Sequence, residues 1–355
     1  MNNNFKRFSE SITHLRFPLI VIIIIYHAYI AAPIPGHVAY YQTIYPLSLW
    51  IGETGVPGFF FISGLLFYYS SKTYTSKIKS RFRTLVIPYF IWNTIILLGY
   101  IAAYFLKFHL QINNGKTLAE YGFFDYIRIF WDCGDWDGGI GKPIYPIMWF
   151  VRNLMLLCLL SPIWKYLIEK TGLLLPVGCG IYWILLPNMG LAYESISFFC
   201  LGAFFPIKKI NLMTFLNKYH PALLGLVIAL GIADFVTHTI IICPYDLIIH
   251  RIALFLNVIS LPLFGTYFAR HCSRMASLSH MSFFIFCTHL PIVIIIRKPA
   301  LWHPELSSIT HVFIFIFSII VITLLCITCY QMTKRFIPTF LGYATGNRSH
   351  YSLTS

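Results

Sequence analysis

Charged residues are scarce in this sequence, and their scarcity excludes an ordinary soluble protein. Only 11% of the 355 residues are Asp, Glu, Lys or Arg, whereas soluble domains carry about 25%. Hydrophobic residues make up 58% of the chain, and apolar runs of about 20 residues, the length that crosses a bilayer as a helix, recur with short polar breaks. No stretch between these runs has the length of a soluble domain. The composition therefore predicts an all-α, polytopic membrane protein.

Other features that are missing exclude further classes. The formal charge is +14, but the basic residues lie in short clusters between apolar runs and form no long basic arm, so we expect no nucleic-acid partner. His, Cys, Asp and Glu form no cluster with metal-ligand spacing, so no metal is expected. Most of the nine cysteines lie inside apolar runs; Cys326 and Cys329 form a C-x-x-C there, which favours packing over redox chemistry.

About ten membrane spans are predicted. They lie near 15–34, 49–70, 84–106, 145–164, 172–190, 193–207, 220–240, 249–269, 281–297 and 310–332, and the fifth and sixth are the hardest to separate. The basic start with Lys6 and Arg7 resembles a secretory signal, but the run that follows is too long, so we expect a retained first span. The chain divides into an N-terminus (1–12), a transmembrane domain (13–332) and a tail (333–355).

Lysine and arginine favour cytoplasmic loops, and this rule sets the orientation. With the N-terminus inside, 18 of the 26 basic residues fall on the cytoplasmic side. Both termini are therefore predicted to be cytoplasmic. The long loop at about 107–144 is then predicted outside, and its sequence WDCGDWDGG alternates carboxylates with indole rings, including Asp132, Asp135 and Trp136. Such residues bind sugars, but a solvated turn at the membrane interface explains them equally well.

The first span carries two polar groups on one face. Arg16 and His27 are eleven residues apart, which on a helix returns to within about 20° of the same face with about 16 Å of rise. This places Arg16 near the cytoplasmic surface and His27 near the middle of the bilayer, where an ionisable group marks a site or pathway. Neutral imidazole acts as a general base, and arginine grips phosphate, although Arg16 also fits a simple interfacial anchor.

Further polar residues flank other spans. Glu53 begins a span in which Ser63 and Gly64 allow close packing, and it is either an interfacial carboxylate or a group that orients His27. Lys79, Arg81 and Arg83 precede the third span and suit either an anionic cytoplasmic ligand or lipid headgroups.

Two other spans carry a basic residue of their own. Arg152 needs a partner, for which Glu53 or a loop aspartate is the cheapest choice. His289 fits a structural or a functional role equally.

These motifs together resemble the acyltransferase-3 family of integral-membrane acyltransferases. The resemblance rests on the Arg-x10-His pair of Arg16 and His27 and, in order, on VPGFFFISGLLF, RFRTLVIPYFIWN, WFVRNLMLLCLLSP, FFCLGAFF and SFFIFCTHLPIV. It extends from about residue 13 to 332. The Arg-x10-His and serine-glycine motifs are the specific ones, because the later passages are mostly apolar.

The resemblance implies transfer of an acyl group, usually acetyl from cytoplasmic acetyl-CoA, to a hydroxyl of a cell-envelope glycan. It implies His27 as the catalytic histidine and Arg16 as its motif partner, with Lys79, Arg81 and Arg83 toward the CoA phosphates; members often space the arginines as Arg-x-x-Arg, which this chain does not. Membrane lipid, acyl-CoA and a glycan acceptor are the expected partners, in a bacterial inner or plasma membrane. The acceptor or supporting residues are Glu53, Ser63, Trp149, Arg152, Asp132, Asp135, Trp136 and His289.

Two other classes compete with an enzyme. A transporter or flippase for an anionic or lipid-linked solute also needs buried Arg and His, but it is expected to show two related halves with broken helices, and the sequence shows no such symmetry. A structural membrane partner leaves the alignment of Arg16 with His27 unexplained.

Overall fold

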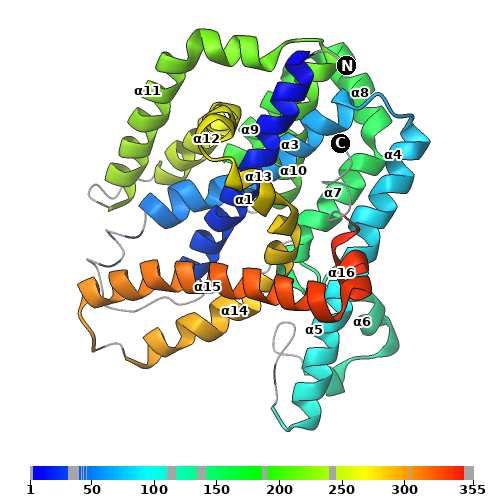
Figure 1. Cartoon of the computed structure of the whole chain (residues 1–355), viewed down its shortest axis with the longest axis vertical. Coiled ribbons are helices and arrows are strands. Elements are labelled where there is room, and N and C mark those ends of the chain that lie inside the picture. Colours follow the sequence, from blue (N-terminus) through cyan, green and yellow to red (C-terminus); the bar gives the residue numbers. More distant parts are fainter. Residues whose placement is uncertain are drawn as a thin grey trace.

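The computed structural model describes residues 3–30, 40, 42, 44, 46–108, 110, 117–133, 141–185, 190–239, 245–303 and 305–347. These residues form helices joined by short connections, and none of them lies in a strand (Figure 1). The predicted all-α class is therefore confirmed. Asp135 and Trp136 lie outside the described residues.

Seven helices in the described part of the chain are long and apolar enough to cross a membrane, and the number becomes eight if the bent pair α7–α8 is one span. This confirms a multi-pass membrane protein, while the predicted count of ten stays a prediction. The longer helices are α1 (Asn3–Ile30), α3 (Gly55–Tyr69), α5 (Ile87–Phe105), α7 (Trp149–Leu159), α8 (Ser161–Thr171), α9 (Leu174–Leu185), α10 (Gly190–Ile207), α11 (Leu212–Thr239), α12 (Asp246–His271), α14 (Ser282–Trp302) and α15 (Ser308–Phe336).

Short helices complete the chain and connect the long ones. The short α-helices are α4 (Tyr74–Arg81), α6 (Phe123–Arg128), α13 (Arg274–Leu278) and α16 (Pro338–Thr345). The remaining turns of helix are η1 (Pro46–Ile51), η2 (Gly52–Thr54), η3 (Phe82–Val86), η4 (Leu118–Glu120), η5 (Pro146–Met148) and η7 (Ser279–Met281).

Helix α1 lies in the middle of the molecule, where it packs against α3, α12, α14 and α15 (Figure 1). Its side chains Leu19, Ile20 and Ile24 are completely buried. A helix that is apolar on nearly every side is stable only where neighbours surround it. The first span therefore becomes the core of the bundle, although Arg16 on it is exposed.

Helices α3 and α10 approach each other at two glycines. A Cβ atom added to Gly64 would lie 2.0 Å from the backbone oxygen of Phe199, and one added to Gly202 would lie 2.0 Å from that of Phe61. Small residues allow such backbone approach between membrane helices. The close packing predicted for the serine-glycine motif is confirmed, and it places Ser63, beside Gly64, in this helix pair.

The structure departs from the predicted spans at three places. Helix α1 begins upstream of residue 15, and its apolar span is Ser9–Tyr29, so His27 lies in the last turn and Arg16 lies inside the span. The predicted fourth span bends by 70° between α7 and α8, where Pro162 sits in the first turn of α8. Beyond residue 333, α16 packs on α5, and the Trp92 indole donates to the carbonyl of Ala344 at 3.0 Å.

Candidate active site

His27 and His289 lie side by side inside the bundle. The centroids of their rings are 5.1 Å apart, and the rings come from α1 and α14, which pack together. His289 is completely buried, and His27 is half-buried. The structure thus brings together two histidines that are 262 positions apart in the sequence.

The backbone fixes the proton arrangement of His289. Its Nδ1 atom lies 2.7 Å from the carbonyl oxygen of Phe286 and 3.2 Å from that of Ile285. Carbonyl oxygens only accept, so Nδ1 carries the hydrogen and the neutral ring has its lone pair on Nε2. This buried Nε2 has no hydrogen-bond partner among the described residues. It is therefore a ready hydrogen-bond acceptor next to His27.

Aromatic rings extend from the histidine pair. Phe286 contacts His289 with ring centroids 6.0 Å apart, and it contacts Phe150 at 5.6 Å. Phe150 packs on Phe60 at 4.8 Å, and Phe60 packs on Trp149 at 5.9 Å. These contacts place Trp149, one of the predicted supporting residues, at the far end of an aromatic wall that begins at His289.

The loop after α6 reaches the C-terminal end of α1, where His27 lies. Lys142 interacts electrostatically with His27, so this part of the loop lies near the histidine pair. The two arms of the loop are joined where the Cys133 amide donates to the carbonyl of Lys142 at 2.9 Å. Asp132, on one arm, forms an ion pair with Arg128 at 3.4 Å.

Arg152 holds this loop in place. Its guanidinium donates to the backbone carbonyls of Trp131 and Gly141, and it lies over the Trp131 ring. Asp132 adds a favourable electrostatic interaction. A loop aspartate is thus one of its partners, as predicted, whereas Glu53 has no recorded contact with it among the described residues. Because Arg152 joins two points ten residues apart, it closes the base of the loop.

Glu53 binds His250 and Tyr26 rather than His27. Its Oε2 atom lies 2.7 Å from Nε2 of His250, and its carboxylate also accepts a hydrogen bond from the Tyr26 hydroxyl. Tyr26 precedes His27 in α1, and their rings meet edge to face with centroids 5.3 Å apart. Successive residues on a helix point about 100° apart, so Glu53 reaches the neighbour of the histidine instead of the histidine itself.

Basic residues gather around the middle of α1, on the N-terminal side of His27. Arg16 is exposed although the residues on either side of it are buried, and its charge interacts with that of Arg81. Arg81 and Lys77 both lie over the Phe67 ring, at 5.9 and 5.0 Å from its centroid. Like charges gathered in this way attract an anion.

A cleft of about 520 Å³ opens beside these residues. It lies between the end of α3, helix α4, helix α8 and the end of α10, and Phe67 and Lys77 connect it to Arg81. Its lining includes Lys165, which pairs with Glu169 at 3.8 Å, and Lys209. Pockets for small ligands commonly measure about 300–1,000 Å³, so this cleft has the size of a binding site.

The three basic residues predicted to bind CoA, on α4 and the segment that follows it, do not all face the same way. Arg81 faces the bundle, whereas Lys79 and Arg83 are exposed. Residues four apart share a helix face, so Lys77, which the sequence did not single out, accompanies Arg81. The sequence also missed Lys142, Asp234 and His250, because their partners lie far away along the chain; a buried Asp and His inside apolar runs were the available signal.

The fold and this site define a class of protein. The model of the acyltransferase-3 family, which describes an acyltransferase domain, matches residues 9–330, so the chain belongs to this family of membrane acyltransferases. The chain is also similar to the succinoglycan biosynthesis protein ExoH of Rhizobium meliloti (strain 1021), with 26% identity over 325 residues that cover 85% of this chain and 82% of that protein. No solved structure matches the chain significantly.

Proposed function

We propose that this protein transfers an acetyl group from cytoplasmic acetyl-CoA to a hydroxyl of a cell-envelope polysaccharide, with His27 as the general base. Membership of the acyltransferase-3 family supports the acyl transfer, and similarity to a succinoglycan biosynthesis protein supports a polysaccharide acceptor. The single observation that carries the mechanism is that His27, on the helix that also bears Arg16, lies beside His289 of α14.

The donor enters, in this proposal, beside Arg16 near the middle of α1. Arg16 and Arg81 repel each other unless an anion lies between them, and the phosphates of CoA supply one. The cleft beside Lys77 has room for the nucleotide portion of the donor. Arg16 and His27 share a face of α1 with a rise of about 16 Å between them, so an extended pantetheine arm bound along this face brings the thioester toward His27.

The reaction at His27 is a single proton-coupled displacement. The neutral imidazole takes the proton of the acceptor hydroxyl while the hydroxyl oxygen bonds to the thioester carbon. The carbon–sulfur bond then breaks, and the departing CoA thiolate takes a proton from the imidazolium. Nε2 of His289 accepts a hydrogen bond from the imidazolium and thereby stabilises it, as the third member of a catalytic triad does.

The acceptor approaches the C-terminal end of α1, where carboxylates and aromatic rings lie near the histidine pair. Glu53 is partly exposed there, Trp149 ends the aromatic wall, and Arg152 holds the loop that carries Asp132. Carboxylates accept sugar hydroxyls and aromatic rings stack on the apolar faces of sugars. Asp135 and Trp136 belong to the same loop segment, and Ser63 supports the site through the packing of α3.

Surface polysaccharide from cells with and without the protein tests this function. NMR and mass spectrometry should detect O-acetyl esters that are present only when the protein is present, while the sugar backbone stays the same. The proposal would be contradicted if cells without the protein accumulated polysaccharide inside and its acylation were unchanged. That result would indicate a transporter in a bacterial inner or plasma membrane.

A further inference from the structure

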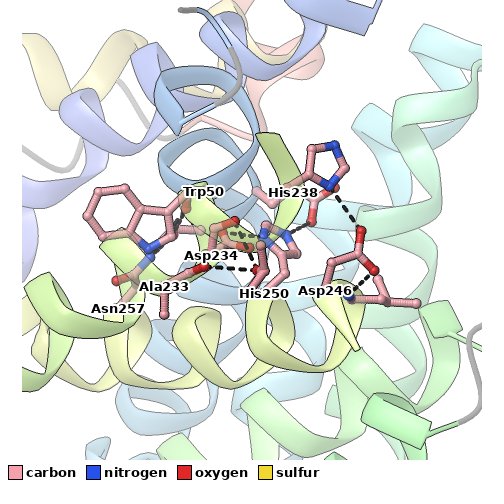
Figure 2. A network of polar contacts seen from close by, with 11 residues as sticks. Trp50, Ala233, Asp234, His238, Asp246, His250 and Asn257 are labelled. Carbon is pink, nitrogen blue, oxygen red and sulfur yellow. Dashed lines mark hydrogen bonds and ion pairs between the residues drawn. The ribbon is translucent and has the colours of Figure 1, made fainter. Parts of the chain in front are cut away.

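Three ionisable residues from separate segments form a chain near the His27 end of α1. His250 of α12 contacts Asp234 of α11 through Nδ1 at 2.9 Å (Figure 2). It contacts Glu53 of η2 through Nε2 at 2.7 Å. The exposed fraction of the side chains rises along the chain, from 0% for Asp234 to 8% for His250 and 32% for Glu53. The chain therefore begins in the interior and ends at accessible space.

The contacts of His250 define its charge and that of its partners. Each ring nitrogen faces a carboxylate oxygen, and an ionised carboxylate only accepts hydrogen bonds. Both contacts are therefore hydrogen bonds when the imidazole carries both of its protons. A positive ring between two carboxylates offsets much of the cost of burying them. Glu53 is consequently held as an anion in one orientation.

The segment that carries Glu53 is fixed to the same helix by a second set of contacts. The Asn257 amide donates to the backbone oxygen of Trp50 at 3.2 Å (Figure 2). It also donates to Oγ1 of Thr54 at 3.1 Å. Glu53 lies between these two anchor points, and its carboxylate also accepts the hydroxyl of Tyr26. Backbone and side chain are thus both constrained beside the helix turn that contains His27.

We propose that His250 and Asp234 are positioning residues that hold the Glu53 carboxylate as the hydrogen-bond acceptor for a hydroxyl of the polysaccharide. This inference rests on the proposed function and deepens it. An ion pair that only stabilised the bundle would gain nothing from leaving one carboxylate a third exposed, because solvent weakens it. A fixed anion beside the Tyr26 ring instead offers a strong acceptor together with an apolar surface.

The same two helices supply a matched control. His238 of α11 lies 3.0 Å from Asp246 of α12, so it forms a second histidine–carboxylate contact between these helices (Figure 2). Its two side chains are 41% and 34% exposed. Replacement of His238 removes an interhelical contact of the same chemistry and leaves the Asp234–His250–Glu53 chain intact.

The test measures acetyl transfer by the full-length protein in proteoliposomes at varied concentrations of polysaccharide and of acetyl-CoA. For His250→Gln and Asp234→Asn we expect the KM for polysaccharide to rise about tenfold or more, as for loss of a charge-assisted hydrogen bond, with the KM for acetyl-CoA unchanged. In a Glu53→Gln background the same substitutions should add little, since the group that they position is already neutral. His238→Gln should leave both KM values unchanged.

Three outcomes would overturn the proposal. The first is an equal change in both KM values, and the second is an equal effect of His238→Gln; either one indicates a purely structural role. The third is a full additional effect of Asp234→Asn in the Glu53→Gln background. A parent protein that transfers no acetyl group to polysaccharide would instead overturn the proposed function, and this inference would fail with it.

Discussion

At the scale of single residues, the polar side chains around α1 form two groups of opposite chemistry. Arg16 and Arg81 repel each other near the middle of the helix, and His27 lies in its last turn, beside His289 of α14. Uncompensated polar groups inside a membrane protein are costly, so each group is expected to serve a ligand. A phosphate-rich donor suits the first group, and a hydroxyl that must lose its proton suits the second.

The donor assignment predicts an effect on affinity. Arg81→Ala and Lys77→Ala should each raise the KM for acetyl-CoA by about tenfold, because each removes a charge-assisted contact with phosphate. Arg83→Ala should have a smaller effect, since its side chain is exposed and does not face the cleft. Initial rates at varied acetyl-CoA and constant polysaccharide measure this. Equal effects of the three substitutions would move the phosphate site away from the cleft.

Sequence spacing placed the two candidate residues of α1 on one face, but it did not find the residues that lie beside them. Arg16 and His27 share a helix face by spacing alone, so their alignment follows from the chain. The neighbours of His27 do not, since His289 and Lys142 approach it only through tertiary packing. For the same reason Glu53 could not be matched with His250, which is 197 residues away.

At the scale of helices, the α3–α10 pair depends on the absence of side chains at Gly64 and Gly202. A methyl group there would overlap a backbone oxygen of the facing helix, and a backbone cannot move aside as a flexible side chain can. The serine-glycine motif therefore has a structural role that is independent of any chemistry performed by Ser63.

Alanine substitution at these glycines should destabilise the protein. Gly64→Ala and Gly202→Ala are each expected to lower the free energy of unfolding by about 1–3 kcal/mol, the usual cost of overpacking. Gly225→Ala is the matched control, because an added Cβ at that helical position meets nothing within 4 Å. Thermal unfolding in detergent measures the difference. A Gly64→Ala protein as stable as the Gly225→Ala protein would show that the two helices lie farther apart.

Arg152 predicts a second effect at this scale, on the loop that it closes. Arg152→Gln should leave the carbonyls of Trp131 and Gly141 without their donor, and the loop should then be cleaved several-fold faster by an added protease. Arg128→Gln, which removes only an exposed ion pair with Asp132, should change the cleavage rate little. Equal cleavage of the two variants would remove the assigned role of Arg152.

At the scale of the whole molecule, the apolar runs predicted the all-α class and the approximate place of most long helices, but not the short helices α4, α6, α13 and α16. They did not predict where helices bend or continue, because hydropathy averages over many residues. The bend between α7 and α8 lies at Pro162, and the packing of α16 on α5 is a tertiary contact that joins Trp92 to Ala344. The upstream extension of α1 is polar at its start, so no apolar run indicated that the helix begins there.

The orientation of the molecule is a prediction that two exposed positions can test. Lys72 lies between α3 and α4 on the predicted cytoplasmic side, and Glu305 lies between α14 and α15 on the predicted outer side. In intact cells, a membrane-impermeant thiol reagent should label a Glu305→Cys protein and should label Lys72→Cys only after the membrane is opened. The parent protein gives the background from its own cysteines. The reverse labelling pattern would contradict the predicted orientation, and with it the assignment of donor and acceptor to opposite sides of the membrane.

The most direct test of the account is the acetyl-transfer rate of His27→Gln in proteoliposomes supplied with acetyl-CoA and polysaccharide. His311→Gln is the control, because His311 is another histidine inside the bundle, completely buried in α15. Loss of a general base costs about 10²–10⁴ in rate, so His27→Gln should lose at least a hundredfold while it unfolds at the temperature of the parent protein, and His311→Gln should keep most of its activity. A His27→Gln protein that transfers acetyl groups at the rate of the parent would contradict the account.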